Sequence, residues 1–154
     1  MKISWTALLL LGLVPAPPAA ADDTGLTLSD AWVRALPPGQ SNTAAYLQLN
    51  NSGDEPLRIT GASSDIAALV EIHTTREVDG YRRMEQLQQL TLAPGQQLEL
   101  APGGTHLMLL DLERMPSAGE QVRLCLALAS GQQACTTAEV RRDGGQQPHQ
   151  HHQH

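Results

Sequence analysis

The sequence has no phenylalanine, and its two tryptophans and two tyrosines make aromatic residues only 3% of the 154-residue chain. Lysine is equally scarce: Lys2 is the only one, and arginine supplies the remaining positive charge. The formal net charge is −6, which argues against a nucleic-acid-binding protein because such proteins are usually basic. A folded core in this chain must therefore consist mainly of aliphatic side chains.

No apolar run is long enough to cross a membrane, since a spanning helix needs about 20 residues. The longest run, Ile3 to Val14, follows Lys2 and precedes three prolines and three alanines, which is typical of a cleavable leader. We predict a signal peptide over residues 1–21, with no cysteine near the cut to carry a lipid. The mature chain is then a single periplasmic domain over residues 22–142, followed by a tail over 143–154.

Only two cysteines are present, Cys125 and Cys135, and both lie in the exported part, where the environment is oxidising. The aliphatic residues of 122–128 alternate onto one face and leave Cys125 on the other. A turn at Ser130-Gly131 would place Cys135 opposite it on the polar side of a hairpin. We predict a cross-strand disulfide; two separate thiols or a thiolate metal site are the alternatives.

Long helical patterns are rare, and short alternating runs separated by turn residues dominate the chain. The expected strands cover residues 26–35, 43–51, 56–63, 69–75, 89–94, 97–100, 105–113, 121–129 and 134–142. A turn or two of helix is expected over residues 63–69. Eight or nine short strands at this spacing predict an all-β antiparallel sandwich or barrel.

Histidine and methionine are few between the leader and the tail: His73, His106, Met84, Met108 and Met115. Such residues are usually solvent-facing histidines and core methionines. Strand alternation, however, places His73 on the opposite face of its strand from its buried neighbours. It also places His106 and Met108 on one face, with Cα atoms about 6.6 Å apart. Met84 lies between charged residues, which is a poor position for a core side chain.

Imidazole and thioether groups together indicate a particular metal ion. Thioether sulfur is soft and selects Cu(I), and the chain lacks the site cysteine that an electron-transferring blue-copper centre requires. Four neutral ligands suit a monovalent ion. We therefore predict a Cu(I) site made by His73, Met84, His106 and Met108.

The spacing of these residues resembles the H(M)x10Mx21HxM signature of the periplasmic copper chaperones called PCu(A)C. The segments DAWVRALPPG, TAAYLQLNN and PGGTHLMLLDL extend the resemblance over residues 26–140. It implies a cupredoxin-like, Greek-key β-sandwich that carries Cu(I) as a monomer. It also implies delivery to the copper-binding subunit of cytochrome oxidase, directly or with a thiol-containing copper-transfer protein. Thr74 and Thr105 depart from the usual methionine and aromatic residue.

The tail, DGGQQPHQHHQH, has no apolar residues and is expected to be disordered. Its histidines form a candidate secondary Cu(II) site, since imidazole-rich segments bind such ions. These residues are His149, His151, His152 and His154. A solvated end or a purification remnant is the alternative interpretation.

Other functions find less support in the residues. Catalysis is not expected, because the sequence has no GxSxG motif and no carboxylate pair near the two histidines. A copper-buffering or resistance protein would need the same four ligands, so the sequence does not separate it from a chaperone. A purely structural or adhesive sandwich domain would bind no copper.

Overall fold

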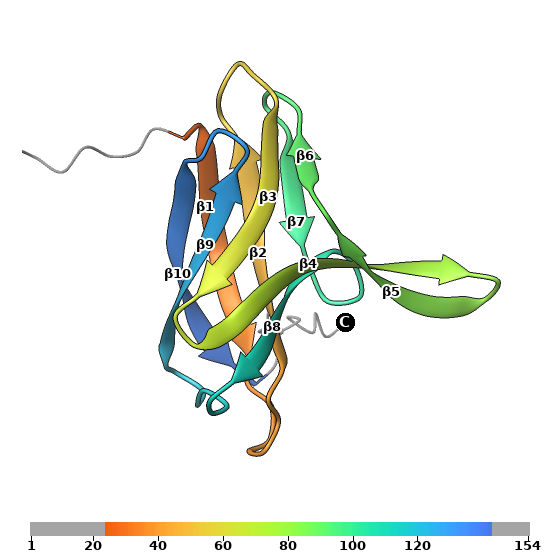
Figure 1. Cartoon of the computed structure of the whole chain (residues 1–154), viewed down its shortest axis with the longest axis vertical. Coiled ribbons are helices and arrows are strands. Elements are labelled where there is room, and N and C mark those ends of the chain that lie inside the picture. Colours follow the sequence, from red (N-terminus) through yellow and green to blue (C-terminus); the bar gives the residue numbers. More distant parts are fainter. Residues whose placement is uncertain (1–23, 143–154) are drawn as a thin grey trace, which may run out of the picture.

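The computed structural model describes residues 24–142, which form ten strands (Figure 1). The strands are β1 (Leu26–Arg34), β2 (Thr43–Asn51), β3 (Leu57–Ser64), β4 (Ala67–Val78), β5 (Tyr81–Leu87), β6 (Leu90–Leu92), β7 (Gln97–Leu100), β8 (His106–Leu112), β9 (Gln121–Leu128) and β10 (Gln133–Arg141). The predicted leader (1–21) and histidine-rich tail (143–154) lie outside the described residues. No helix within residues 24–142 is long and apolar enough to span a membrane.

Seven of the strands form a closed ring. The sheet runs β5-β4-β8-β2-β1-β10-β9-β3-β6, and an additional pairing of β4 with β3, at Val70 and Ala62, closes it. Most neighbours are antiparallel, whereas β1 and β10 are parallel, with Trp32 opposite Glu139. The predicted all-β sandwich is therefore confirmed, with the first and last strands side by side.

The core inside this ring is aliphatic, as the absence of phenylalanine requires. Alternating residues point inward along each strand, so leucines and valines fill the interior from every side. The largest fully buried side chains are Leu47, Leu49, Ile59, Leu92, Leu100, Leu107, Leu109, Leu124, Leu126, Val33, Val122 and Val140. On β8, Leu107 and Leu109 face inward, which leaves His106 and Met108 on the outer face of the ring.

The helix expected over residues 63–69 is wrong. Ser64 ends β3 and Ala67 begins β4, with only a bend between them. Asp65 in this bend accepts a hydrogen bond from the backbone N–H of Arg123 (3.0 Å), and Ala67 pairs with Leu112. Strand pairing on both sides therefore overrides the helix propensity of the two alanines.

The sequence also did not indicate β5 as a strand. Tyr81–Leu87 is polar because β5 lies at the edge of the sheet and covers no core, so the segment lacks the period-two apolar pattern of a half-buried strand. Its pairing with β4 is continuous from Ile72 with Leu87 to Val78 with Tyr81. The β4–β5 hairpin extends away from the other strands (Figure 1).

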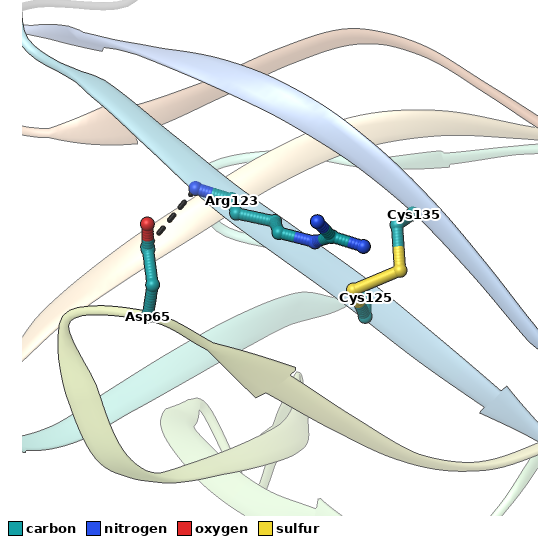
Figure 2. Close-up of a disulfide and its surroundings, with 4 residues drawn as sticks. All are labelled: Asp65, Arg123, Cys125 and Cys135. Carbon is teal, nitrogen blue, oxygen red and sulfur yellow. Dashed lines mark hydrogen bonds between the residues drawn. A yellow bond between two sulfur atoms is a disulfide. The ribbon is translucent and has the colours of Figure 1, made fainter. Parts of the chain in front are cut away.

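The predicted disulfide between Cys125 and Cys135 is present (Figure 2). The two residues are directly opposed in the β9–β10 ladder, with Cα atoms 4.0 Å apart. Cys125 is nearly buried and Cys135 is exposed on the outer face, where Arg123 lies on the same strand as Cys125. The crosslink joins strands that already pair, so its role is structural.

Replacing both cysteines with serine should lower the free energy of unfolding by about 2 to 3 kcal/mol, because the crosslink no longer restricts the unfolded chain. For a domain of this size that corresponds to a fall in Tm of about 10 °C. Thermal unfolding followed by circular dichroism measures it. Wild-type protein unfolded with a reductant is the matched control and should agree with the variant. Equal Tm values for oxidised wild type and variant would contradict the prediction.

Candidate metal site

The pairing of β4 with β8 brings three of the predicted ligands together. His73 on β4 is directly opposite His106 on β8, and Glu71 is directly opposite Met108. Directly opposed residues project to the same side of a sheet, and so do residues two apart on one strand. Both imidazoles and the Met108 thioether therefore share the outer face, with the imidazole ring centroids 6.0 Å apart.

The pairing of β5 with β4 adds the fourth ligand to this face. Gln86 is opposite His73, and Met84 is opposite Thr75, one step further along the hairpin. Met84 is therefore a diagonal neighbour of His73, at a Cα separation of about 7–8 Å for this arrangement. We call the outer surface of β5, β4 and β8 that carries the four predicted ligands the donor face.

The four side chains differ in their access to solvent. His106 is buried at 5% exposure, whereas His73 and Met108 are half-buried. Met84 is 55% exposed, one of the most exposed large hydrophobic side chains within residues 24–142. Met115, which was not predicted as a ligand, packs against the core instead. Three ligands thus sit on the ring itself, and the fourth stands on the projecting hairpin.

The turn before β8 fixes the orientation of His106. Its Nδ1 lies 3.0 Å from the carbonyl oxygen of Gly104, to which it donates as Nδ1–H. Gly104 is itself held by a backbone hydrogen bond to Ala101 (3.1 Å). This bond selects the tautomer whose lone pair is on Nε2, which is the nitrogen left to bind a metal.

An aromatic cluster of Trp32 and Tyr46 packs beside His106. Their ring centroids are 4.4 Å apart, and the Tyr46 ring lies 6.3 Å from the imidazole. The Arg34 guanidinium lies 5.3 Å from the Tyr46 ring centroid, within cation–π range. Burial raises the pKa of Tyr46, and the charge of Arg34 opposes this rise. The Tyr46 ring thus lies next to the buried His106.

His73 has a different partner. Its Nε2 lies 2.7 Å from a carboxylate oxygen of Glu71, two residues earlier on the same strand. Its Nδ1 is buried and has no hydrogen-bond partner among the described residues. An unpaired buried nitrogen beside a second imidazole fits a metal ligand. Its spacing in EIH places Glu71 on the same face as His73, but the sequence alone indicated no role for Glu71 in the site.

The two residues that depart from the family pattern contact each other. The Thr105 hydroxyl donates to the Thr74 hydroxyl (3.2 Å), and the Thr75 backbone N–H donates to the Gly104 carbonyl (3.3 Å). Thr74 lies on the opposite side of β4 from His73, so a methionine there would point away from the donor face. The pair fastens the turn before β8 to β4.

The donor set is made of nitrogen and sulfur. Within residues 24–142 there is no group of three or more His, Cys, Asp or Glu side chains placed to hold a metal ion. Strand register places two imidazoles and two thioethers on the donor face, and this combination suits a soft monovalent ion.

Comparison with known proteins agrees with this architecture. The copper-bound PCuAC domain from PmoF2 has the same fold, with a TM-score of 0.64 and 24% identity over 77% of this chain and 94% of that domain. Apo-DR1885 from Deinococcus radiodurans gives a TM-score of 0.61 and 30% identity over 92% of this chain and 97% of that one. The CuI-DR1885 structure gives 0.61 and 32% identity, over 75% and 77% of the two chains.

The ring is that of a cupredoxin-like domain of the PCu(A)C class, which confirms the resemblance found in the sequence. The chain belongs to the LpqE-like lipoprotein family, whose model matches residues 26–140. A relative in Leifsonia xyli subsp. xyli, named "Putative lipoprotein Lxx21020", is 29% identical over 154 residues, which cover 94% of this chain and 92% of that protein. In this chain the two cysteines lie inside the folded domain, at 125 and 135.

Proposed function

We propose that this protein is a periplasmic carrier of Cu(I) rather than an enzyme, with His73, Met84, His106 and Met108 as the ligands. The strand register carries the proposal, because it places all four donor side chains on one face of the sheet. The similarity to DR1885, a protein with a Cu(I)-bound structure, supports the choice of ion. No ligand has to lose a proton at neutral pH, so the site accepts one positive charge without excess negative charge.

We further propose that the carrier delivers its ion to the copper centres of cytochrome oxidase, directly or through a thiol-containing partner protein. The exposure of Met84 supports transfer, because an incoming ligand can replace the exposed thioether first while the other three still hold the ion. Ligands exchanged one at a time avoid the cost of releasing a free ion. A buffering protein that keeps its copper is the alternative function.

The histidine-rich tail is proposed to capture Cu(II) as a second, separate activity. Its four histidines at 149, 151, 152 and 154 supply imidazole donors, which bind Cu(II) strongly. The tail lies outside residues 26–140, which the family model matches, so a shortened chain can test this activity separately.

Copper titration of the mature chain (22–154) and of a chain ending at residue 142 tests these proposals. Both chains should take one Cu(I), measured anaerobically against a chromogenic chelator, and only the longer chain should take additional Cu(II). Mixing the Cu(I)-loaded protein with a purified oxidase copper-binding domain should move copper to that domain. Failure of wild type to bind Cu(I) would overturn the carrier function, and retention of the ion would favour buffering.

A further inference from the structure

The two histidines of the donor face are held by different kinds of hydrogen bond. His106 uses Nδ1 to donate to a backbone carbonyl, which leaves Nε2 for a metal. His73 uses Nε2 to contact the Glu71 carboxylate at 2.7 Å, and its Nδ1 is the buried, unpartnered atom. The nitrogen left free to bind a metal is therefore Nε2 on His106 but Nδ1 on His73.

We infer that His73 binds Cu(I) through Nδ1, and that Glu71 is a positioning residue that holds this ring in the required tautomer. The inference rests on the proposed Cu(I) site and specifies how one of its ligands works. A neutral imidazole that donates from Nε2 carries its lone pair on Nδ1. The carboxylate acceptor thus keeps the lone pair on the atom that has no other partner.

The surroundings of Glu71 explain why it acts through His73 rather than as a ligand. Its side chain is only 21% exposed, and its carboxylate oxygen is already bonded to Nε2. A carboxylate is a hard donor, which a soft Cu(I) ion disfavours beside thioether sulfur. Its backbone position opposite Met108 places its negative charge next to the proposed site.

Carboxylate partners of this kind orient histidine ligands and raise their basicity, and removing them typically weakens metal binding about 10- to 100-fold. We therefore expect Glu71→Ala to raise the Kd for Cu(I) by about that factor. Glu71→Gln keeps an acceptor oxygen for Nε2–H and should recover most of the affinity. Glu77→Gln is the matched control, because Glu77 is exposed and lies on the same face of β4 as His73, four residues further along the strand.

The experiment combines Cu(I) affinity with long-range 1H–15N spectra of the histidine rings in the full mature chain, at a pH where the rings are neutral. In the metal-free wild type and in Glu71→Gln, the His73 proton should be on Nε2, and Cu(I) should perturb Nδ1. Glu71→Ala should show a mixture of the two tautomers, a change that a purely structural role would not produce. A His73→Gln variant assigns the signals.

Perturbation of Nε2 of His73 by Cu(I) would overturn the inference while leaving the Cu(I) site intact, and so would wild-type affinity in Glu71→Ala. If wild type takes no Cu(I) at all, the proposed function fails and the inference fails with it. A loss of affinity in Glu77→Gln equal to that in Glu71→Ala would show that only the local charge matters, which also overturns the positioning role.

Discussion

Replacing all four donor side chains should abolish Cu(I) binding while the β-sandwich stays folded. The quadruple variant combines His73→Gln, His106→Gln, Met84→Leu and Met108→Leu, which keep side-chain volume close to the original. No imidazole or thioether ligand then remains on the donor face. Competition with a chromogenic Cu(I) chelator should detect no protein-bound ion, and circular dichroism should show unchanged strand content.

The methionines alone provide a graded form of this test. Met84→Leu combined with Met108→Leu leaves two imidazoles as ligands. We expect the Kd for Cu(I) to rise more than about a hundredfold, because losing a residue that only hydrogen-bonds to a ligand typically raises it by about 10- to 100-fold. Met115→Leu is the matched control, since Met115 packs against the core and should leave Kd unchanged. Wild-type affinity in the quadruple variant would show that the ion binds elsewhere.

Replacing Asn51 with aspartate should strongly destabilise the fold at neutral pH. Asn51 is fully buried at the end of β2, where its Nδ2 donates to the carbonyls of Glu55 (2.8 Å), Leu92 (3.2 Å) and Ala93 (3.1 Å). Its Oδ1 accepts from the Gly53 N–H (3.0 Å). Aspartate has the same shape but turns an oxygen toward three carbonyl oxygens.

The variant protein can fold only if the carboxyl group of this aspartate stays protonated. Its pKa in the folded state therefore lies above the unfolded value of about 3.9. Keeping the proton at pH 7 costs about 4 kcal/mol, at about 1.4 kcal/mol per unit of pH. The loss of stability should therefore be small below about pH 4 and should grow as pH rises. Chemical denaturation at both pH values measures it.

Asn50→Asp is the control for this prediction. Asn50 is the adjacent residue on β2, is only half-buried and points to the other side of the strand. Its replacement changes the net charge by the same amount but adds no buried carboxyl. Equal free energies of unfolding for the two variants at pH 7 would contradict the role assigned to Asn51.

Local alternation in the sequence predicts much of the donor face. It places His106 and Met108 together, separates His73 from the buried Ile72, and sets Cys125 opposite Cys135, because strand periodicity depends only on neighbours along the chain. The pairing of β4 with both β8 and β5 could not be predicted in this way. Register between distant strands depends on the whole core, so the direct opposition of His73 and His106 became evident only in the structure.

Side-chain contacts were the least predictable part. The bond from Thr105 to Thr74 joins residues far apart in the chain. Asn51 is an ordinary strand residue until the carbonyls of Glu55, Leu92 and Ala93 surround its side-chain amide. Glu71 is the exception, since its two-residue spacing from His73 is visible in the sequence. Polar residues on an edge strand such as β5 carry too little periodicity to reveal their conformation.

The parallel pairing of β1 with β10 has a consequence for how the protein folds. These strands hold opposite ends of the described chain, so the ring closes only after the last strand has been synthesised. Topologies dominated by such distant pairings fold slowly, in milliseconds to seconds. The chain therefore cannot complete its closed ring until β10 is available to pair with β1.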